Sequence, residues 1–240
     1  MMFIEVLLLL CFALLPAIEL IDSGSTKQRI TTGKITKVRA YQETILLLLV
    51  PSSLLFTLMA LGDVSAHELG LIIDFNVSQC IAFLGVVVIV GYLLISFRSV
   101  VDNKRELAKI AKQLNGFHYL LPSNVNEARW FIGGVSVCAG VCEELLFRGY
   151  LLHALDEYIG LPLSVVVSSA LFGLCHVYQG WNNVLRTALV GAVLSIIYLL
   201  SGSLYVVIIL HFLQDAYIGL LYFITQRKHA DNYSSSYSSR

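Results

Sequence analysis

The chain has 240 residues, of which 57% are hydrophobic and 13% are charged. That balance excludes an ordinary soluble domain, in which about 25% of residues are charged. Acidic and basic residues are equal in number, so the net charge is zero and by itself indicates no partner. No nucleic-acid partner is expected. The composition therefore predicts an integral membrane protein that is surrounded by the lipid bilayer.

Apolar runs follow one another along the chain and predict an all-α, polytopic membrane helix bundle of about seven transmembrane helices. The first run has no Lys or Arg before it. It therefore lacks the charged start of a secretory signal peptide and is predicted to be a retained helix. The predicted spans are residues 3–21, 43–62, 80–97, 130–155, 161–178, 184–200 and 204–225.

The charges of the connections predict the orientation of the bundle. A Ser/Thr/Gly-containing loop after the first span is rich in cations, whereas the connection after the second span contains acidic residues and no Lys or Arg. Because Lys and Arg concentrate in cytoplasmic loops, the N-terminus is predicted outside and the C-terminus in the cytoplasm, with the cell inner membrane as the location. The cations of the first loop are Lys27, Arg29, Lys34, Lys37 and Arg39.

The connection between the third and fourth spans has the pattern of an amphipathic helix. Asp102 is placed to cap this helix and Gly116 to end it. The pattern predicts a helix that lies on the cytoplasmic surface, with binding of a protein partner as the alternative use. Its apolar residues are Leu107, Ile110, Ala111 and Leu114, and the opposite face carries Lys104, Arg105, Lys109 and Lys112.

These patterns divide the chain into four predicted parts. Residues 1–98 form the first three transmembrane helices, and residues 99–129 form the amphipathic helix and a linker. Residues 130–225 form a core of four further helices, which carries the intramembrane charges. Residues 226–240 form a cytoplasmic tail that is too polar to fold alone.

Three ionisable side chains lie close together in the fourth predicted span. An ionised group at the bilayer centre costs about 2.5–3.5 kcal/mol on insertion scales, so each needs a partner or a function. Glu144 precedes Arg148 by four residues, which predicts an ion pair that supports the site. Glu143 is turned about 100° away from Glu144 and cannot share Arg148 in the same way. Glu143 is therefore the first candidate for a general base.

Two later spans contribute further polar side chains. The fifth contains His176, preceded by Phe172, which is expected to pack rather than to bind substrate. The seventh contains His211 and Asp215, four residues apart, so Asp215 is predicted to accept a hydrogen bond from one ring nitrogen of His211. Because positions facing lipid are unfavourable for such groups, all of them are expected to share one interior.

These residue types suit the hydrolysis of an amide bond. A glutamate can take a proton from water, while two histidines position the water and stabilise the oxyanion. Glu143, His176 and His211 could equally bind a catalytic zinc ion with one open position, and the sequence does not separate the two mechanisms. A single intramembrane His is about as often a structural hydrogen-bonding residue. A proton-coupled carrier is a further alternative, although no internal repeat is found.

The order of these residues resembles a known family. Over about residues 130–225 the chain is similar to the CAAX prenyl proteases and bacteriocin-processing enzymes, the intramembrane group that includes the Ras-converting enzyme. The family pattern is Glu-Glu-x3-Arg, then Phe-x3-His, then His-x3-Asn or Asp, on successive membrane helices. The matching residues here are Glu143, Glu144, Arg148, Phe172, His176, His211 and Asp215.

The resemblance implies an intramembrane endopeptidase with a cavity open toward the cytoplasmic side. It implies that Glu143 activates a water with His176, and that His211 and position 215 stabilise the oxyanion. Some family members carry Asn where this chain has Asp215, and an ionised Asp cannot donate a hydrogen bond. Asp215 is therefore expected to orient His211, to bind a metal or to be protonated.

The resemblance also implies the partners. We expect a peptide or protein substrate, either a lipidated protein or one with a leader or sorting peptide. The alternative is a non-catalytic membrane scaffold or a bacteriocin-immunity protein of the same fold, which would not need the polar residues for its activity.

Overall fold

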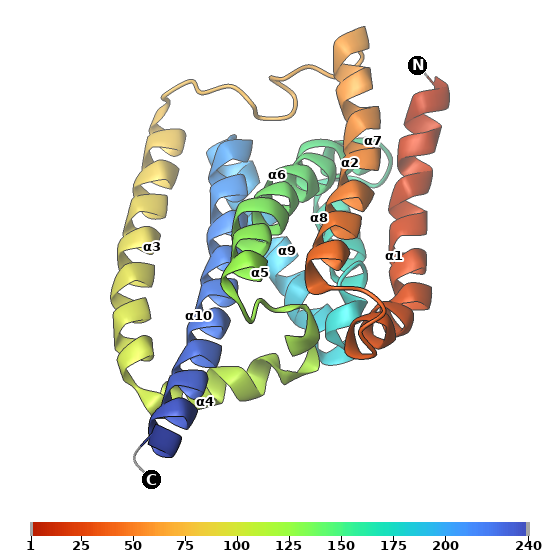
Figure 1. The fold of residues 1–240 in the computed structure, drawn as a ribbon. Coiled ribbons are helices and arrows are strands. Elements are labelled where there is room, and N and C mark those ends of the chain that lie inside the picture. The colour runs from red at the N-terminus through yellow and green to blue at the C-terminus, as the bar shows by residue number, and fades with distance from the viewer. Residues whose placement is uncertain (1, 239–240) are drawn as a thin grey trace.

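A computed structural model describes residues 2–238, and in this part of the chain every regular element is helical (Figure 1). The predicted fold class is therefore confirmed. Within the described residues, six helical segments are long and apolar enough to cross a membrane. A seventh apolar helix, predicted as the fifth span, has only 14 residues.

The first two helices form a hairpin whose connection is shorter than predicted. Helix α1 (Met2–Thr31) continues ten residues past the predicted end at residue 21, and α2 (Lys37–Leu61) begins soon after it. Most of the predicted cation-rich loop is therefore helical, which corrects the prediction. No proline interrupts this stretch, and the hydroxyls of Thr31 and Thr32 bond back to carbonyls one turn earlier.

Helices α3 (Val77–Asp102) and α4 (Lys104–Gln113) frame one side and one end of the bundle. In Figure 1, α4 runs across the end of the bundle instead of along it, as expected of a surface helix. Its Leu107 is buried against the bundle. The helix is capped by Asn103, whose side chain accepts hydrogen bonds from two backbone amides. The predicted cap at Asp102 was wrong, because that residue still belongs to α3.

The fourth span is one continuous helical segment of 35 residues, Val125–Ile159, longer than the predicted 130–155. Two stretches of it have the wide turns of a π-helix, which are rare and occur most often at functional sites. Its parts are α5 (Val125–Trp130), η3 (Phe131–Val135), α6 (Ser136–Glu144), η4 (Leu145–Leu151) and α7 (Leu152–Ile159).

The chain then turns back through α8 (Leu161–Leu174) and the short helix η5 (Val177–Gln179). The predicted turn at Trp181–Asn183 was wrong, since these residues form the first turn of α9 (Trp181–Ser201). Helix α10 (Leu204–Ser238) passes the predicted end at 225, so the tail is helical where described. The last two residues of the predicted tail lie outside the described residues.

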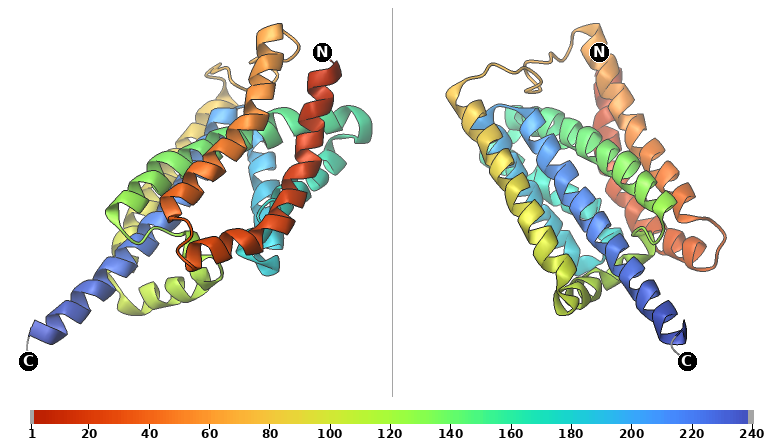
Figure 2. Two further views of the ribbon diagram at one scale, coloured as in Figure 1. Left: turned by 45° about the vertical axis from the view of Figure 1, so that its right-hand side comes forward. Right: turned by 60° about the vertical axis from the view of Figure 1, so that its left-hand side comes forward.

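Small residues let the central helices approach closely. A Cβ atom on Gly173 of α8 would lie 2.6 Å from the carbonyl oxygen of Val184 on α9, and one on Gly140 of α6 would lie 3.2 Å from the backbone of α10. Such contacts are typical of helix packing in membranes. Figure 2 shows that the start of α1 and the end of α10 lie at opposite ends of the bundle, in agreement with an odd number of crossings.

Candidate active site

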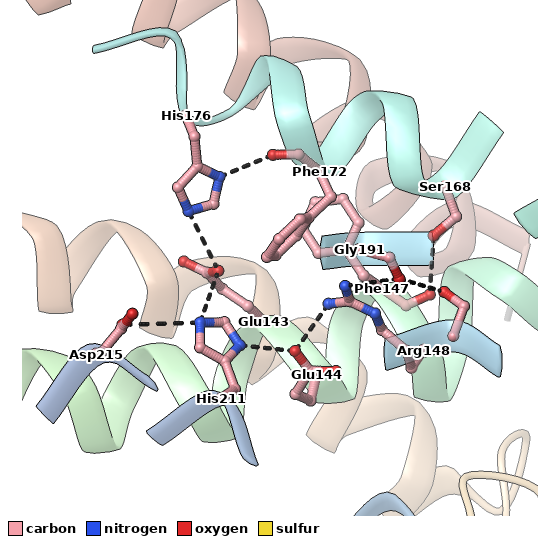
Figure 3. A network of polar contacts seen from close by, with 11 residues as sticks. Glu143, Glu144, Phe147, Arg148, Ser168, Phe172, His176, Gly191, His211 and Asp215 are labelled. Atoms are coloured by element: carbon pink, nitrogen blue, oxygen red, sulfur yellow. Dashed lines mark hydrogen bonds and ion pairs between the residues drawn. The ribbon is translucent and has the colours of Figure 1, made fainter. Parts of the chain in front are cut away.

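The structure brings the sequence-predicted polar residues together at the meeting point of three segments (Figure 3). The long fourth span provides the two glutamates and the arginine, the turn after α8 provides one histidine, and α10 provides the other histidine and the aspartate. These residues are Glu143, Glu144, Arg148, His176, His211 and Asp215.

Glu144 lies at the centre of the buried part of this network. Its Oε1 atom accepts a hydrogen bond from Arg148 Nη1 at 2.8 Å and contacts His211 Nδ1 at 2.6 Å. A carboxylate paired with a guanidinium can only accept, so the Nδ1 atom of His211 must carry the hydrogen. Glu144 therefore fixes the tautomer of His211 and directs its Nε2 atom toward Glu143 and Asp215.

Sequence reasoning had assigned this orienting role to Asp215, and the structure differs. The Oδ2 atom of Asp215 lies 3.7 Å from His211 Nε2, which is the other ring nitrogen and is beyond hydrogen-bond range. The spacing of four residues does bring the two side chains near each other. It could not reveal that Glu144, 67 positions away from His211, takes the nearer nitrogen.

Arg148 is almost completely buried, with a side-chain exposure of 1%. Its Nη2 atom donates to the Gly191 carbonyl at 3.2 Å, and its guanidinium lies 4.2 Å from the centre of the Phe172 ring. A Cβ atom on residue 191 would lie 3.3 Å from that nitrogen, so a glycine leaves room for the contact. Sequence reasoning missed Gly191, because nothing marks it among the 17 glycines of the chain.

His176 is held by the end of the preceding helix, α8. Its Nδ1 atom donates to the Phe172 carbonyl at 2.8 Å, which leaves Nε2 as the acceptor in the neutral ring. The ring of Phe172 packs against both histidines, with centroids 4.8 Å from His176 and 5.9 Å from His211. Phe172 thus supports three functional side chains at once, in line with the packing role expected of it.

Glu143 faces the two histidines. Its Oε2 atom lies 3.8 Å from the Nε2 atom of His176 and 3.8 Å from that of His211. This oxygen is buried and has no hydrogen-bond partner among the described residues. Separations of this size are too long for direct hydrogen bonds but allow one water to lie about 2.8 Å from each atom. The side chain retains 14% exposure, so the position is not sealed from its surroundings.

The alternative of a bound zinc ion receives no support from this geometry. Among the described residues, no group of three or more His, Cys, Asp or Glu side chains is arranged to hold a metal ion. Zinc binding by Glu143, His176 and His211 therefore remains a prediction from the sequence. The proposed reaction uses no metal ion.

Comparison with known proteins finds a family model that matches part of the chain. Residues 125–217 match the family model described as type II CAAX prenyl endopeptidase Rce1-like. This domain match agrees with the family resemblance predicted from the motifs over about residues 130–225. The Rce1-like segment contains all six polar residues of the network, and a family of this kind indicates a membrane-embedded protease. No curated protein and no solved structure gives a significant match to the chain.

Proposed function

We propose that the chain is an intramembrane endopeptidase in which Glu143 activates a water that attacks a peptide bond. The observation that carries this proposal is the buried, unpartnered Oε2 atom of Glu143, which faces the Nε2 atoms of two histidines. A positioned carboxylate within reach of a water is the arrangement needed for general-base catalysis. The Rce1-like match supports peptide hydrolysis as the reaction.

The proposed reaction begins when Glu143 removes a proton from the water while the Nε2 atom of His176 accepts its second hydrogen as a hydrogen bond. The water oxygen bonds to the carbonyl carbon of the substrate, and the electron pair of the C=O double bond moves to the oxygen. The C–N bond then breaks, and the leaving amine takes the proton from Glu143. Such acid–base transfer typically contributes 10² to 10⁴ in rate.

The proposed role of His211 is to hold the carbonyl oxygen. This role requires a protonated His211 with an Nε2–H donor, and the carboxyl groups of Glu144 and Asp215 lie 2.6 and 3.7 Å from its two ring nitrogens. Glu144 and Arg148 support this geometry without contacting substrate. Asp215 has the most exposed side chain of the network, at 28%, which suits a position at the entrance.

The proposed substrate is a peptide or protein in contact with the bilayer, either lipidated or carrying a leader or sorting peptide. The matching family, described as type II CAAX prenyl endopeptidase Rce1-like, supports a lipidated C-terminus as the first choice. We further propose the orientation with the N-terminus outside and the C-terminus in the cytoplasm of a cell inner membrane, with the site open toward the cytoplasm. The cations near the end of α1 support this orientation.

The Glu143→Gln variant tests the proposal. The amide keeps the shape of the side chain but cannot take a proton from water, so cleavage should fall at least 10²-fold. The assay uses purified protein in liposomes with a prenylated peptide that ends in a CAAX sequence. Mass spectrometry measures the release of the last three residues of this peptide.

Glu157→Gln is the matched control, because Glu157 is exposed on the same helical segment, 14 residues or about 21 Å beyond Glu143. This variant should cleave the peptide at the same rate as the unchanged protein. Cleavage by Glu143→Gln at the unchanged rate would contradict the mechanism. A cellular phenotype that survives Glu143→Gln would instead favour the non-catalytic scaffold.

A further inference from the structure

Tyr178 is a polar residue beside the site for which the proposed reaction has no role so far. It lies in η5, two residues after His176, and the two rings are 5.8 Å apart at an angle of 32°. The turn that carries both residues is anchored from outside. The Tyr119 hydroxyl donates to the Tyr178 carbonyl at 3.3 Å, and the Asn183 amide donates to the Gln179 carbonyl at 2.8 Å. Tyr178 is therefore held in a fixed position relative to His176.

The hydroxyl of Tyr178 still has a hydrogen to donate. Its oxygen accepts a hydrogen bond from the Gln179 Nε2 atom at 3.2 Å, and an amide nitrogen can only donate. The phenol hydrogen is thus not used in that contact. The Tyr178 ring lies beside that of His176, whose Nε2 atom faces Glu143 at 3.8 Å. A phenol with an ordinary pKa of about 10 keeps its hydrogen at neutral pH.

The proposed reaction needs more than one donor for the oxyanion. Glu143 is occupied with the water, and an ionised Asp215 has no hydrogen to offer. His176 Nε2 is an acceptor in the tautomer set by the Phe172 carbonyl. This leaves His211 as the only donor among the residues already assigned. Oxyanion sites usually combine two donors, so a second one is expected nearby.

We propose that the Tyr178 hydroxyl is the second oxyanion donor, which acts together with His211 on the tetrahedral intermediate. This inference rests on the proposed peptide hydrolysis. The phenol hydrogen stays on Tyr178 throughout, and no covalent bond to the ring is formed or broken. The contact strengthens as negative charge moves onto the carbonyl oxygen, so it lowers the barrier more than it improves substrate binding.

The Tyr178→Phe variant removes the donor and keeps the ring. We expect kcat to fall about 10²-fold with little change in KM, which is the usual effect of losing one oxyanion donor. A peptide aldehyde inhibitor, whose hydrate resembles the tetrahedral intermediate, should bind more weakly by a similar factor. The matched control is Tyr198→Phe, since the buried Tyr198 hydroxyl contacts the Glu68 carbonyl in the loop between α2 and α3. This control should keep the unchanged kcat.

A second measurement separates the donor role from a folding defect. Thermal unfolding of Tyr178→Phe should match that of the unchanged protein, because the ring and its contact with His176 are kept.

The outcomes separate this inference from the proposed function. Unchanged kcat and aldehyde affinity in Tyr178→Phe would overturn the donor role. If Glu143→Gln is inactive while Tyr178→Phe is fully active, only the donor role fails. If Glu143→Gln remains active, the proposed hydrolysis itself fails.

Discussion

The two charges buried most deeply, on Glu144 and Arg148, depend on each other. Their side chains have exposures of 0% and 1%, and they form a hydrogen bond of 2.8 Å. Burying an ionised group without a partner is very unfavourable, whereas a paired one is tolerated. The same Glu144 oxygen also holds His211, so stability and catalytic geometry share one atom.

Replacing Arg148 by methionine should destabilise the fold strongly. The substitution leaves Glu144 as a buried carboxylate that keeps only His211 as a charged partner, and losses of about 3–5 kcal/mol are typical of such changes. Unfolding of the purified protein in mixed detergent micelles measures the free energy. The double variant with Glu144→Gln should recover part of this stability without recovering cleavage. If the Arg148→Met protein were as stable as the unchanged protein, the mutual dependence of the Glu144 and Arg148 charges would be refuted.

At the residue scale, local spacing predicted some contacts and missed others. The Glu144–Arg148 pair was predictable because both partners lie on one helix, four residues apart. The contact between Glu144 and His211 was not, because it depends on how α10 packs against α6. The contact between Arg148 and the Gly191 carbonyl could not be predicted either, because it also depends on how separate helices pack.

At the scale of elements, the position of His176 depends on the close packing of α8 against α9. Gly173 lies three residues before His176, and a Cβ atom there would meet backbone and side-chain atoms of α9 at 2.6 and 2.8 Å. Real Cβ contacts are longer than this, so any larger residue must push the two helices apart.

Gly173→Ala should therefore lower both stability and cleavage. Overpacking of this kind typically costs about 1–3 kcal/mol, and displacement of α8 moves His176 away from Glu143. Thermal unfolding and the cleavage rate measure the two effects. Gly85→Ala in α3 is the control, because a Cβ atom there meets no atom within 4 Å. Equal behaviour of the two variants would count against this role of the helix contact.

The existence of the helices was easier to predict than their ends. Hydrophobic runs predicted every membrane segment, since lipid requires helical backbone over its whole thickness. The early end of α8 at Leu174 and the wide turns of η4 could not be read from composition. They depend on contacts between helices, such as the Ser168 hydroxyl that donates to the Phe147 carbonyl.

At the scale of the whole molecule, the long loop between α2 and α3 and the helix α4 lie at opposite ends of the bundle (Figures 1 and 2). In a cysteine-free background, a cysteine at Ala66 should react with a membrane-impermeant maleimide added to intact cells. A cysteine at Lys109 should react only in inverted membrane vesicles. Both positions are exposed, so access depends on the side of the membrane. The reverse labelling pattern would show that the protein has the opposite orientation to the one proposed.

The shortness of α8 has a consequence for which bond a membrane-embedded protease of this shape can cut. At 1.5 Å per residue, the 14 residues of α8 rise about 21 Å, whereas the 21 residues of neighbouring α9 rise about 32 Å, close to the thickness of the hydrocarbon layer. Gly173, three residues before His176, lies against Val184 and Ala188, which are three and seven residues past the start of α9. With the proposed peptide hydrolysis, we expect a substrate anchored in the same bilayer to be cut at the bond that reaches the depth of His176.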